Sequence, residues 1–429
     1  MTQPPGSPTD SQSASPSGSQ QRSQQRSTVL SARVQRVQES MTLKLNALVQ
    51  AMERRGEKIY NFTVGEPDFA VSEAGKDAAR KAIADNRSKY TAVPGISELR
   101  SRIARKTNLQ QPDIAKTKPW TEAEVCVSNG GKQAIANVAM ALLDPGDEVI
   151  IPSPYWLSYP DITLLFDGVP KIVYCPLTDD ATSWKLTPTR LREAITPKTK
   201  LLILNSPSNP AGVTYTKDEL RALGQVLLEK NHERVWVLSD EIYDRIVFAP
   251  HVFVSFLAAC PELRDRTATV NGMSKSAAMT GWRVGWSVAP QILTSAIIKT
   301  QGQMTSGINA VAQWASVAAL DEPPEAFSSY VREYQARLKL VLDSLVGRGK
   351  MKTREPEGAF YLFLRIKEFL KTGEDAVAWC ERLLQEAKVA LVPGEPFGEP
   401  DFVRLSLATD RQTLQEGCDR LVHFARSSR

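Results

Sequence analysis

The chain has 429 residues, of which 42% are hydrophobic and 24% charged, and its formal net charge is +5. This length and composition predict a globular protein with two domains, or with one large and one small domain. We expect the protein to bind neither nucleic acid nor membranes, because no basic block is present and no apolar run approaches the roughly 18 residues of a membrane span.

Residues 1–29 are mostly Ser, Gln, Pro, Gly and Thr, with two arginines, one acidic residue and no leucine or aromatic residue. Such a segment buries too little apolar surface to offset its ordering entropy, so we expect a disordered tail. It lacks the apolar stretch of a secretory signal. A transit peptide is the alternative, although the segment is rich in Gln and has no amphipathic pattern.

The next elements are expected to pack on the smaller domain. Apolar residues recur at helical spacing over 31–51, with an interruption around Ser40, and 59–64 is a predicted strand. Gly and Pro make 65–69 a loop, and helices follow over 73–85 and from Ser97. We therefore treat 30–72 as an N-terminal segment that joins the smaller domain.

Strands and helices alternate from residue 124 onward. The predicted strands are 125–127, 149–151, 171–175, 201–204 and 235–238, and the helices between them include 133–143 and 217–229. Thr216 and Glu219 form a capping box at the start of the second of these helices. The alternation predicts an α/β fold with a doubly wound, mainly parallel sheet in a large domain over 73–322.

The pattern changes after residue 322. A long helix over 325–345 precedes a strand at 360–364, a helix at 376–387, strands at 389–392 and 402–407, and a last helix from Arg411. This order predicts a smaller α+β domain over 323–429.

The five cysteines have no paired spacing, and the three histidines lie far apart in the sequence. We therefore expect a reducing, cytoplasmic location, no disulfide framework and no metal centre.

Lys275 and Arg283 lie in a stretch of small residues, 274–283, that follows the apolar run 268–270. No acidic residue is near them in the sequence. A desolvated lysine loses its proton and attacks a carbonyl, and an arginine binds phosphate. These are two requirements of a pyridoxal-phosphate site; the alternative is a solvated surface loop.

Gly130, Gly131 and Lys132 follow the predicted strand 125–127, where an open α/β sheet binds its ligands. They open a helix, and bare N–H groups at a helix N-terminus suit an anion. The stretch matches neither the GxxxxGK nor the GxGxxG pattern, and a plain tight turn is the alternative.

Asp240 and Tyr243 follow the strand 235–238, and Asn209 lies in the loop after 201–204. A carboxylate at the end of a buried strand is costly unless it is paired, and a protonated pyridinium nitrogen is one such partner. The alternatives are a helix N-cap for Asp240, core packing for Tyr243 and a turn role for Asn209.

Trp156 and Arg404 are candidates for contacts with a flat, anionic ligand. The indole of Trp156 suits stacking on a heteroaromatic ring, and an arginine in the strand 402–407 suits a substrate carboxylate. The alternatives are a core tryptophan and an edge-strand salt bridge.

In this order, the features resemble the fold type I pyridoxal-phosphate aminotransferases of class I, and within them the bacterial aspartate/prephenate aminotransferase subgroup. The resemblance covers about residues 31–427. The stretches that carry it are SARVQRVQESMT, FTVGEPDF, KYTAVPGI, SNGGKQA, DPGDEVIIPSPYW, NSPSNPAG, SDEIYD, NGMSKSAAMTGWRVGW, EGAFYLF and VRLSLAT. It implies the fold type I transferase fold, pyridoxal 5'-phosphate as cofactor and a ping-pong transamination.

The resemblance also implies individual roles. Lys275 corresponds to the lysine that holds the cofactor covalently and then moves the proton during catalysis. Asp240 corresponds to the partner of the ring N–H, and Tyr243 and Asn209 to donors to the ring hydroxyl oxygen. Trp156 corresponds to the aromatic side chain that stacks on the ring.

Two anion sites are implied as well. The residues that match the phosphate site are Gly130, Gly131, Lys132, Ser274 and Arg283. The residues that match the substrate site are Gly65, Trp156, Asn209 and Arg404. Tyr90 corresponds to a tyrosine that reaches the phosphate from the other subunit, which implies a homodimer with shared active sites.

The chain departs from the family pattern at two places. Gly272 stands three residues before the lysine, where many class I enzymes have a serine or threonine that binds the phosphate, and Ser274 is the nearest hydroxyl in the sequence. FAVSE stands where the subgroup often has FDTPE, so the loop after Gly65 is a second point of difference.

Lys132 carries the expectation on substrate. In the subgroup, a lysine after the paired glycines contacts the distal carboxylate of a dicarboxylic substrate, helped by hydroxyls at the positions of Ser40 and Thr42. A cation there favours aspartate, glutamate or prephenate over apolar amino acids. The alternative is a solvent-exposed lysine at the start of a helix.

Other functions remain as alternatives. An aromatic, alanine or kynurenine aminotransferase would share the fold. A non-enzymatic regulator would need a DNA-binding domain, which residues 1–30 cannot form. A nicotinamide oxidoreductase is opposed by the missing GxGxxG pattern.

Overall fold

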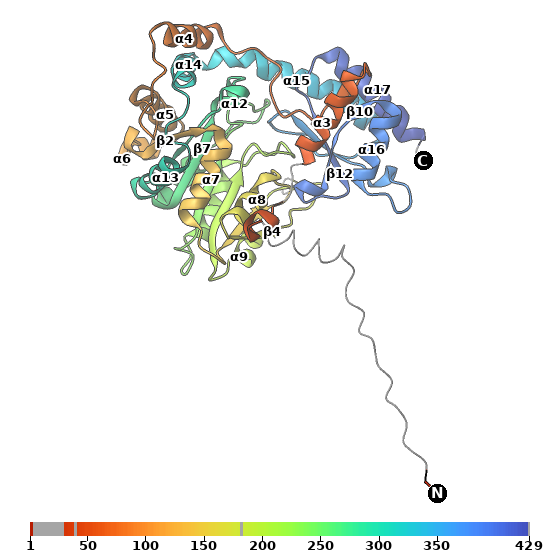
Figure 1. Ribbon diagram of the computed structural model, residues 1–429, viewed down its shortest axis with the longest axis horizontal. Helices are drawn as coiled ribbons and strands as arrows, with labels where there is room; N and C mark the ends of the chain where they lie inside the picture. Colours follow the sequence, from red (N-terminus) through yellow and green to blue (C-terminus); the bar gives the residue numbers. More distant parts are fainter. Residues whose placement is uncertain (3–29, 38–40, 181–182, 428–429) are drawn as a thin grey trace.

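The computed structural model describes residues 1–2, 30–37, 41–180 and 183–427, without the side chains of 42–44 and 324. Its centre is a seven-stranded sheet (Figure 1). The strands in spatial order are β2 (Val125–Asn129), β8 (Val284–Val288), β7 (Thr267–Gly272), β6 (Trp236–Asp240), β5 (Thr199–Asn205), β3 (Glu148–Pro152) and β4 (Val169–Val173). All pairs are parallel except those that β8 makes with β2 and β7, so the prediction of a mainly parallel α/β sheet is confirmed.

The strand β8 was not predicted from the sequence. Gly285 and Ser287 interrupt its apolar pattern, which removes the continuous run expected of a buried strand. Gly285 is required by packing, because a Cβ atom there would lie 2.3 Å from the amide nitrogen of Gly131. Glycine at position 285 thus lets the start of helix α7 (Gly130–Leu142) approach the sheet.

Alternate residues of the central strands face two helix layers. Leu201 and Ile203 pack on one face, while Leu202 and Leu204 pack on the other. The helices of the first layer are α7 (Gly130–Leu142), α8 (Ser158–Leu165) and α13 (Gln291–Met304). Those of the second are α4 (Glu73–Ala84), α5 (Ser97–Gln110), α6 (Pro112–Thr117), α9 (Pro188–Ala194), α10 (Lys217–Leu227), α11 (Phe256–Ala259) and α14 (Ala310–Asp321). The predicted capping box of Thr216 and Glu219 opens α10.

A second group of elements, called here the C-terminal unit, lies beside the large sheet (Figure 1). Its three-stranded antiparallel sheet has the order β11 (Val392–Pro393), β12 (Phe402–Ser406) and β9 (Tyr361–Arg365). Helices α15 (Ser328–Leu342), α16 (Ala376–Ala387) and α17 (Arg411–Ser427) share one apolar core with it. The predicted strand 389–392 is divided, because β10 (Val389–Ala390) pairs elsewhere.

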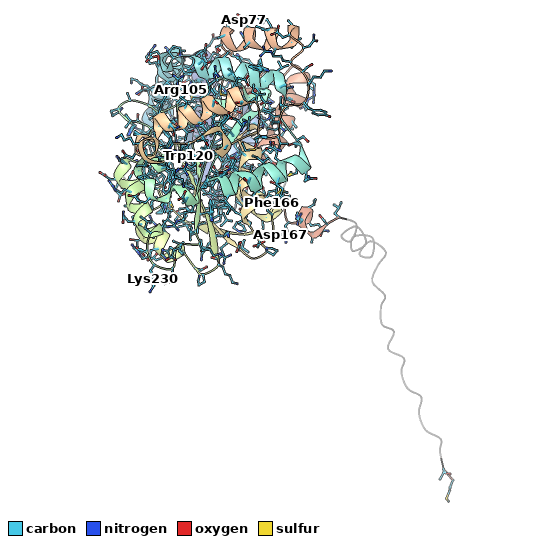
Figure 2. All side chains as sticks on the ribbon, turned by 90° about the vertical axis from the view of Figure 1, so that its left-hand side faces the viewer. Asp77, Arg105, Trp120, Phe166, Asp167 and Lys230 are labelled. Atoms are coloured by element: carbon cyan, nitrogen blue, oxygen red, sulfur yellow. The ribbon has the colours of Figure 1, made fainter. Side chains whose placement is uncertain are left out.

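The N-terminal segment joins this unit. β1 (Tyr60–Asn61) pairs in parallel with β10, and α3 (Met41–Arg54) precedes it. β1 is shorter than the predicted strand 59–64 because its partner has only two residues. The short helix α2 (Ala32–Gln35) lies against α8 (Ser158–Leu165) instead, and its Arg33 donates to Asp167 at 2.7 Å. Figure 2 labels Asp167.

Most of the predicted disordered tail, residues 3–29, lies outside the described residues, as does Ser40. Within the described ranges, no helix combines the length and the apolar character that crossing a bilayer requires.

Candidate active site

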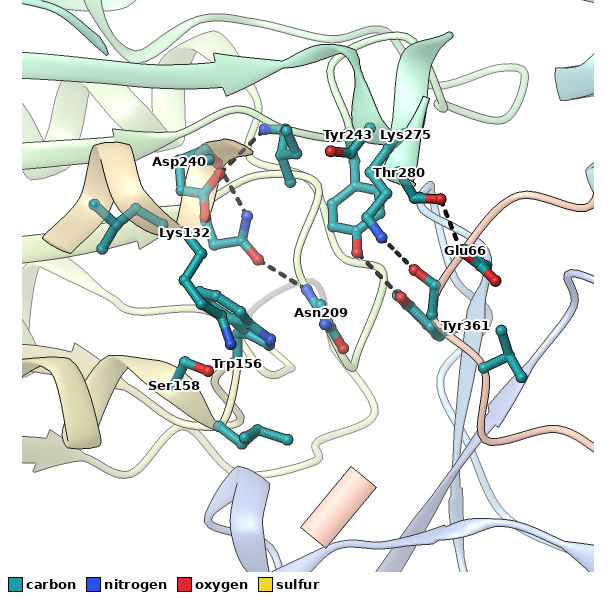
Figure 3. Close-up of a pocket in the computed structure, with 18 of the residues that line it drawn as sticks. Glu66, Lys132, Trp156, Ser158, Asn209, Asp240, Tyr243, Lys275, Thr280 and Tyr361 are labelled. Atoms are coloured by element: carbon teal, nitrogen blue, oxygen red, sulfur yellow. Dashed lines mark hydrogen bonds between the residues drawn. The ribbon is translucent and has the colours of Figure 1, made fainter. Parts of the chain in front are cut away.

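The carboxyl edge of the large sheet gathers most of the predicted site residues. β5 and β6 end there at Asn205 and Asp240, and β7 leads there into the segment that carries Lys275. β8 is antiparallel, so Arg283 enters from the same edge. The edge faces Arg404 of β12, and between them lies a cavity of about 420 Å³ (Figure 3). The predicted residues that line it are Gly65, Gly131, Lys132, Trp156, Asn209, Asp240, Tyr243, Ser274, Lys275, Arg283 and Arg404.

Lys275 projects into this cavity, and its ammonium donates a hydrogen bond to the carbonyl oxygen of Gly65 (Figure 3). Burial lowers the pKa of Lys275 to about 8, and the charge of Arg404 adds to this, while Glu66 opposes it. No acid is near the lysine in sequence, but the fold brings Glu66 and Asp240 within electrostatic range. A substantial share of this amine is neutral at mildly alkaline pH and therefore nucleophilic.

Asp240 is buried at the end of β6 and has no cationic partner among the described residues. Its Oδ2 accepts from the Tyr159 hydroxyl at 2.7 Å and its Oδ1 from the Ile242 amide at 3.2 Å. Burial raises the pKa of Asp240 to about 6 despite these bonds. A turn follows rather than a helix, so the N-cap alternative is wrong. The carboxylate instead suits a cationic N–H donor from a ligand.

Tyr243 and Asn209 are both buried and line the cavity. The Tyr243 hydroxyl donates to the hydroxyl of Tyr361 at 3.2 Å. Asn209 accepts from Arg404 through Oδ1 at 3.0 Å, which leaves its amide nitrogen for a ligand oxygen. Tyr243 also packs in the core of the C-terminal unit, so its two expected roles are not exclusive.

Arg404 is only 3% exposed, yet it forms no ion pair among the residues that the structure describes. Its guanidinium donates to the Asn209 side chain and to the Thr63 carbonyl, both at 3.0 Å, and the buried Nε has no partner. β12 is the central strand of its sheet, so the edge-strand alternative is wrong. A buried guanidinium without an anion suits a carboxylate ligand.

The N-terminus of α7 and Arg283 form one wall of the cavity. A Cβ atom on Gly130 would lie 2.5 Å from Nη2 of Arg283, so only glycine allows this approach. Gly130 also has φ of +80°, a conformation that glycine adopts without strain. α7 begins at Gly130 rather than at the predicted residue 133. The N–H groups of its first turn have no partner within the helix, so this end of α7 suits an anion.

Lys132 and Trp156 lie together at the cavity, with the Lys132 Nζ 5.0 Å from the centre of the Trp156 ring (Figure 3). Partial burial and the charge of Arg283 lower the pKa of Lys132. Trp156 is half-buried and meets Tyr159 edge to face at 5.3 Å. Trp156 therefore lines the cavity and also packs against the apolar core on that face of the sheet.

Comparison with known proteins gives a consistent result. The family described as "Aminotransferase class I and II" matches residues 57–421. The chain belongs to this family. The aspartate/prephenate aminotransferase of Nitrosomonas europaea is 37% identical over 91% of this chain and 98% of its own length. The crystal structure of the aspartate aminotransferase of Rhizobium meliloti superposes with a TM-score of 0.86 at 38% identity, covering 92% of this chain and 98% of that one. The Thermus thermophilus aspartate aminotransferase with maleate gives a TM-score of 0.85 at 38% identity, covering 92% and 99%.

The cofactor of class I and II aminotransferases is pyridoxal 5'-phosphate, and it is the cofactor of this chain. The residues present fit it. The buried Asp240 carboxylate lacks a cation and suits the ring nitrogen, and the lysine amine of lowered pKa suits the carbonyl. Arg283 and the glycine-lined start of α7 suit the phosphate.

Some predicted residues do not line the cavity of this aminotransferase. Gly130 supports Arg283 from behind. Tyr90 is 99% exposed on its own chain, away from the cavity wall. The side chain of Thr42 lies outside the described residues.

Gly272 has no room for the hydroxyl that many class I enzymes have at this position. A Cβ atom there would lie 2.9 Å from the Val284 carbonyl oxygen and 3.0 Å from the Gly285 Cα. Ser274 and Thr280 carry hydroxyls and line the cavity.

Several polar residues that line the cavity were not predicted from the sequence. The residues of this kind that line the cavity include Asn46, Glu66, Ser158, Tyr159, Asn205, Thr280 and Tyr361. Tyr159 lies in α8, but Trp156 precedes that helix, so helical spacing did not indicate that both line the cavity. Tyr361 stands in the stretch EGAFYLF, but apolar neighbours made it indistinguishable from a core residue.

Proposed function

We propose that this aminotransferase exchanges the amino group of aspartate or glutamate with 2-oxo acids by a ping-pong mechanism, and that prephenate is a further acceptor. One observation carries the proposal: besides Lys275 and Arg283, which we assign to the cofactor, the same cavity is lined by two further cations, the buried Arg404 and Lys132 on α7. A dicarboxylic substrate matches two cations, whereas an apolar side chain would leave Lys132 unpaired. The names of the relatives reported above support this choice.

We infer the following roles. The bound cofactor supplies the carbonyl carbon that takes the amino group and the ring that accepts the electron pair released at the substrate α-carbon. Lys275 would hold the cofactor and, once released, would move the proton from the substrate α-carbon, across the nitrogen, to the former carbonyl carbon. Asp240 keeps the ring nitrogen protonated through a charge-assisted hydrogen bond. Tyr243 and Asn209 donate to the ring hydroxyl oxygen.

The remaining residues orient the reactants. Arg404 and the Gly65 backbone bind the α-carboxylate, and Lys132, with Thr42, binds the distal carboxylate. Trp156 stacks on the ring. We assign to the phosphate the backbone of Gly130, Gly131 and Lys132, together with Ser274 and Arg283.

We further propose a cytoplasmic homodimer. The 99% exposure of Tyr90 supports a contact with a second copy of the chain, where it would reach the partner's phosphate site. We divide each subunit into a large domain over 73–322 and a small domain over 323–429, with 30–72 joined to the small one. The pairing of β1 with β10 supports this division.

The test is an absorbance scan of the purified protein followed by steady-state rates. We expect a cofactor band at about 360–430 nm. With aspartate as donor, we expect turnover of 2-oxoglutarate, and of prephenate when it is the acceptor. Absence of any band after addition of pyridoxal phosphate would refute the cofactor site, and a preference for apolar or aromatic donors with no use of aspartate would refute the substrate.

A further inference from the structure

Tyr361 of β9 contacts both halves of the active site. It is buried, lines the cavity, and pairs through its hydroxyl with the hydroxyl of Tyr243 at 3.2 Å (Figure 3). The guanidinium carbon of Arg404 lies 4.4 Å from the centre of its ring. Tyr243 follows β6 of the large sheet, whereas Arg404 belongs to the C-terminal unit. One side chain thus connects the residue assigned to the cofactor hydroxyl with the residue assigned to the substrate carboxylate.

The sheet register explains why Tyr361 and Arg404 meet. In the antiparallel pair of β9 and β12, Tyr361 is opposite Ser406 and Arg404 is opposite Phe363. Residues two positions apart along such a pair lie diagonally on the same face, within reach of a long and an aromatic side chain. The contact is therefore built into the sheet rather than dependent on a mobile loop.

We propose that Tyr361 is a positioning residue that couples the two assignments: its hydroxyl orients Tyr243 as a hydrogen-bond donor to the cofactor, and its ring supports Arg404 for the substrate carboxylate. The inference rests on the proposed function and assigns a role to a residue outside the set predicted from the sequence.

The role of the Tyr361 hydroxyl follows from the number of protons that the two phenols can donate. A phenol has one proton to donate. In this structure Tyr243 donates it to Tyr361, and neither hydroxyl has another protein partner within the described part of the chain. When a ligand oxygen takes the Tyr243 proton, the remaining bond must run from Tyr361 to Tyr243. Burial raises the pKa of both phenols, so both keep their protons at neutral pH. A donor that itself accepts a hydrogen bond is a stronger donor.

The ring part follows from the surroundings of Arg404. Its guanidinium carbon lies 4.4 Å from the Tyr361 ring centre and 5.1 Å from that of Phe397. In a desolvated site such contacts hold a guanidinium in place when no carboxylate does. Tyr361 also constrains the nearby backbone, because a Cβ atom on Gly65 would lie 2.9 Å from its hydroxyl oxygen. Gly65 in turn accepts the hydrogen bond of Lys275.

Two variants separate the hydroxyl from the ring, and a third is the matched control. Tyr361→Phe removes only the hydroxyl, Tyr361→Leu removes both, and Phe397→Leu removes the other ring beside Arg404 without touching Tyr243. Two properties of each cofactor-loaded protein are measured: the pH midpoint at which the absorbance band of the bound cofactor changes, and the affinity for succinate, a dicarboxylate that cannot react.

For Tyr361→Phe we expect the midpoint to rise by about half a unit, because Tyr243 becomes a weaker donor to the developing negative oxygen, with succinate affinity unchanged. For Tyr361→Leu we expect the same rise and succinate affinity about tenfold weaker, as for loss of a desolvated cation–π contact. Phe397→Leu should weaken succinate binding and leave the midpoint where it was.

An unmoved midpoint in Tyr361→Phe, while the wild-type protein shows a normal band, overturns the coupling and leaves the proposed function intact. Wild-type succinate affinity in Tyr361→Leu overturns the support of Arg404 in the same way. If the wild-type protein shows no band, the proposed function and this inference fail together. Tyr361→Phe preserves the packing volume, so the test does not depend on the more drastic variant folding.

Discussion

Two arginines of the C-terminal unit are equally buried but differ in their partners. Arg337 of α15 is 5% exposed and pairs with Asp68 at 2.8 Å and Glu333 at 2.9 Å. Arg404 of β12 is 3% exposed and has only an amide oxygen and a backbone carbonyl. Burial opposes the charge of both. The two carboxylates outweigh it and raise the pKa of Arg337, whereas burial prevails and lowers the pKa of Arg404.

The same contrast recurs for other buried charges. Lys185 is buried and bonded to Glu219 at 3.1 Å, whereas Lys275 has no carboxylate bonded to it. A buried charge that forms an ion pair within the protein needs no further partner, whereas an unpaired one marks a candidate site for a ligand of opposite charge. In this molecule Lys275, Asp240 and Arg404 have no ion-pair partner among the described residues, and all three line the same cavity.

The largest expected effect is that of Lys275→Ala. Activity should fall by at least about a thousandfold, because the proton-transferring group is removed, and the cofactor band should shift to that of the free compound. The paired control, Lys185→Met, should keep the band and unfold more easily, since it leaves Glu219 without its cation and removes one of the two cations beside Glu357. Rates, spectra and urea unfolding of both proteins measure the difference; a Lys275→Ala protein with wild-type turnover would contradict the assignment.

Exchanging Arg404 and Arg337 separately for methionine tests the difference between an unpaired and a paired buried arginine. Arg404→Met should lower kcat/KM by about two to three orders of magnitude through loss of charge-assisted bonds to the α-carboxylate, with unfolding free energy unchanged or higher. Arg337→Met should lower the unfolding free energy by about 3 kcal/mol, because it strands the Asp68 carboxylate and leaves Glu333 with Arg411 alone. Comparable destabilisation by both variants would show that Arg404 is a structural residue.

A smaller effect is expected at Lys132. Lys132→Gln removes the cation while keeping a side chain of similar length, so the preference for aspartate over an apolar donor should fall by about tenfold. Rates with the apolar donor should stay close to those of the wild-type protein. Equal losses for both donors would point to a contribution to cofactor binding instead.

The smallest effect concerns Glu399, a buried acid whose one side-chain bond is to Ser153, at 3.2 Å. Burial raises the pKa of Glu399 to about 7, above its unfolded value of 4.5. Folding therefore favours the protonated form, and this contribution is fully present below about pH 4.5 and is lost as pH rises through about 7. Glu399→Gln stays neutral, so its melting temperature should exceed that of the wild-type protein at pH 8.5 and match it at pH 4.5.

Glu357 is the paired control for this pH dependence. Burial would raise its pKa, but bonds from Thr214 and the charges of Lys185 and Arg354 outweigh burial and lower it. Glu357→Gln should therefore lower the melting temperature at pH 8.5. A gain in stability for both variants at that pH would contradict the distinction between paired and unpaired acids.

The fold was predictable where local pattern determines it. Continuous apolar strands alternating with helices predicted the parallel sheet, and α16 occupies the predicted range 376–387. The pattern failed at β8, where Gly285 is dictated by the approach of α7, and at β1, whose length is set by β10. In both cases the deciding partner is remote in the sequence.

The site was predictable in part for the same reason. Parallel strands end at one edge of a sheet, so residues that follow such strands meet there, and Lys275, Asp240 and Asn209 could be grouped from chain direction alone. Tyr159 and Tyr361 could not be grouped in this way, because nothing in their local sequence distinguishes them from other tyrosines. The fold places the Tyr159 hydroxyl 2.7 Å from Asp240 and the Tyr361 hydroxyl 3.2 Å from that of Tyr243.

The sequence by itself thus determined the doubly wound architecture and the types of group that the sheet edge presents, since both follow from short-range periodicity and chain direction. Only the tertiary structure decided which of the buried charges are neutralised internally. Pairing depends on contacts between distant segments: Asp240 meets Tyr159 across 81 residues, and Arg404 meets Asn209 across 195. That no carboxylate pairs with Arg404 among the residues that the structure describes is a property of that three-dimensional arrangement alone.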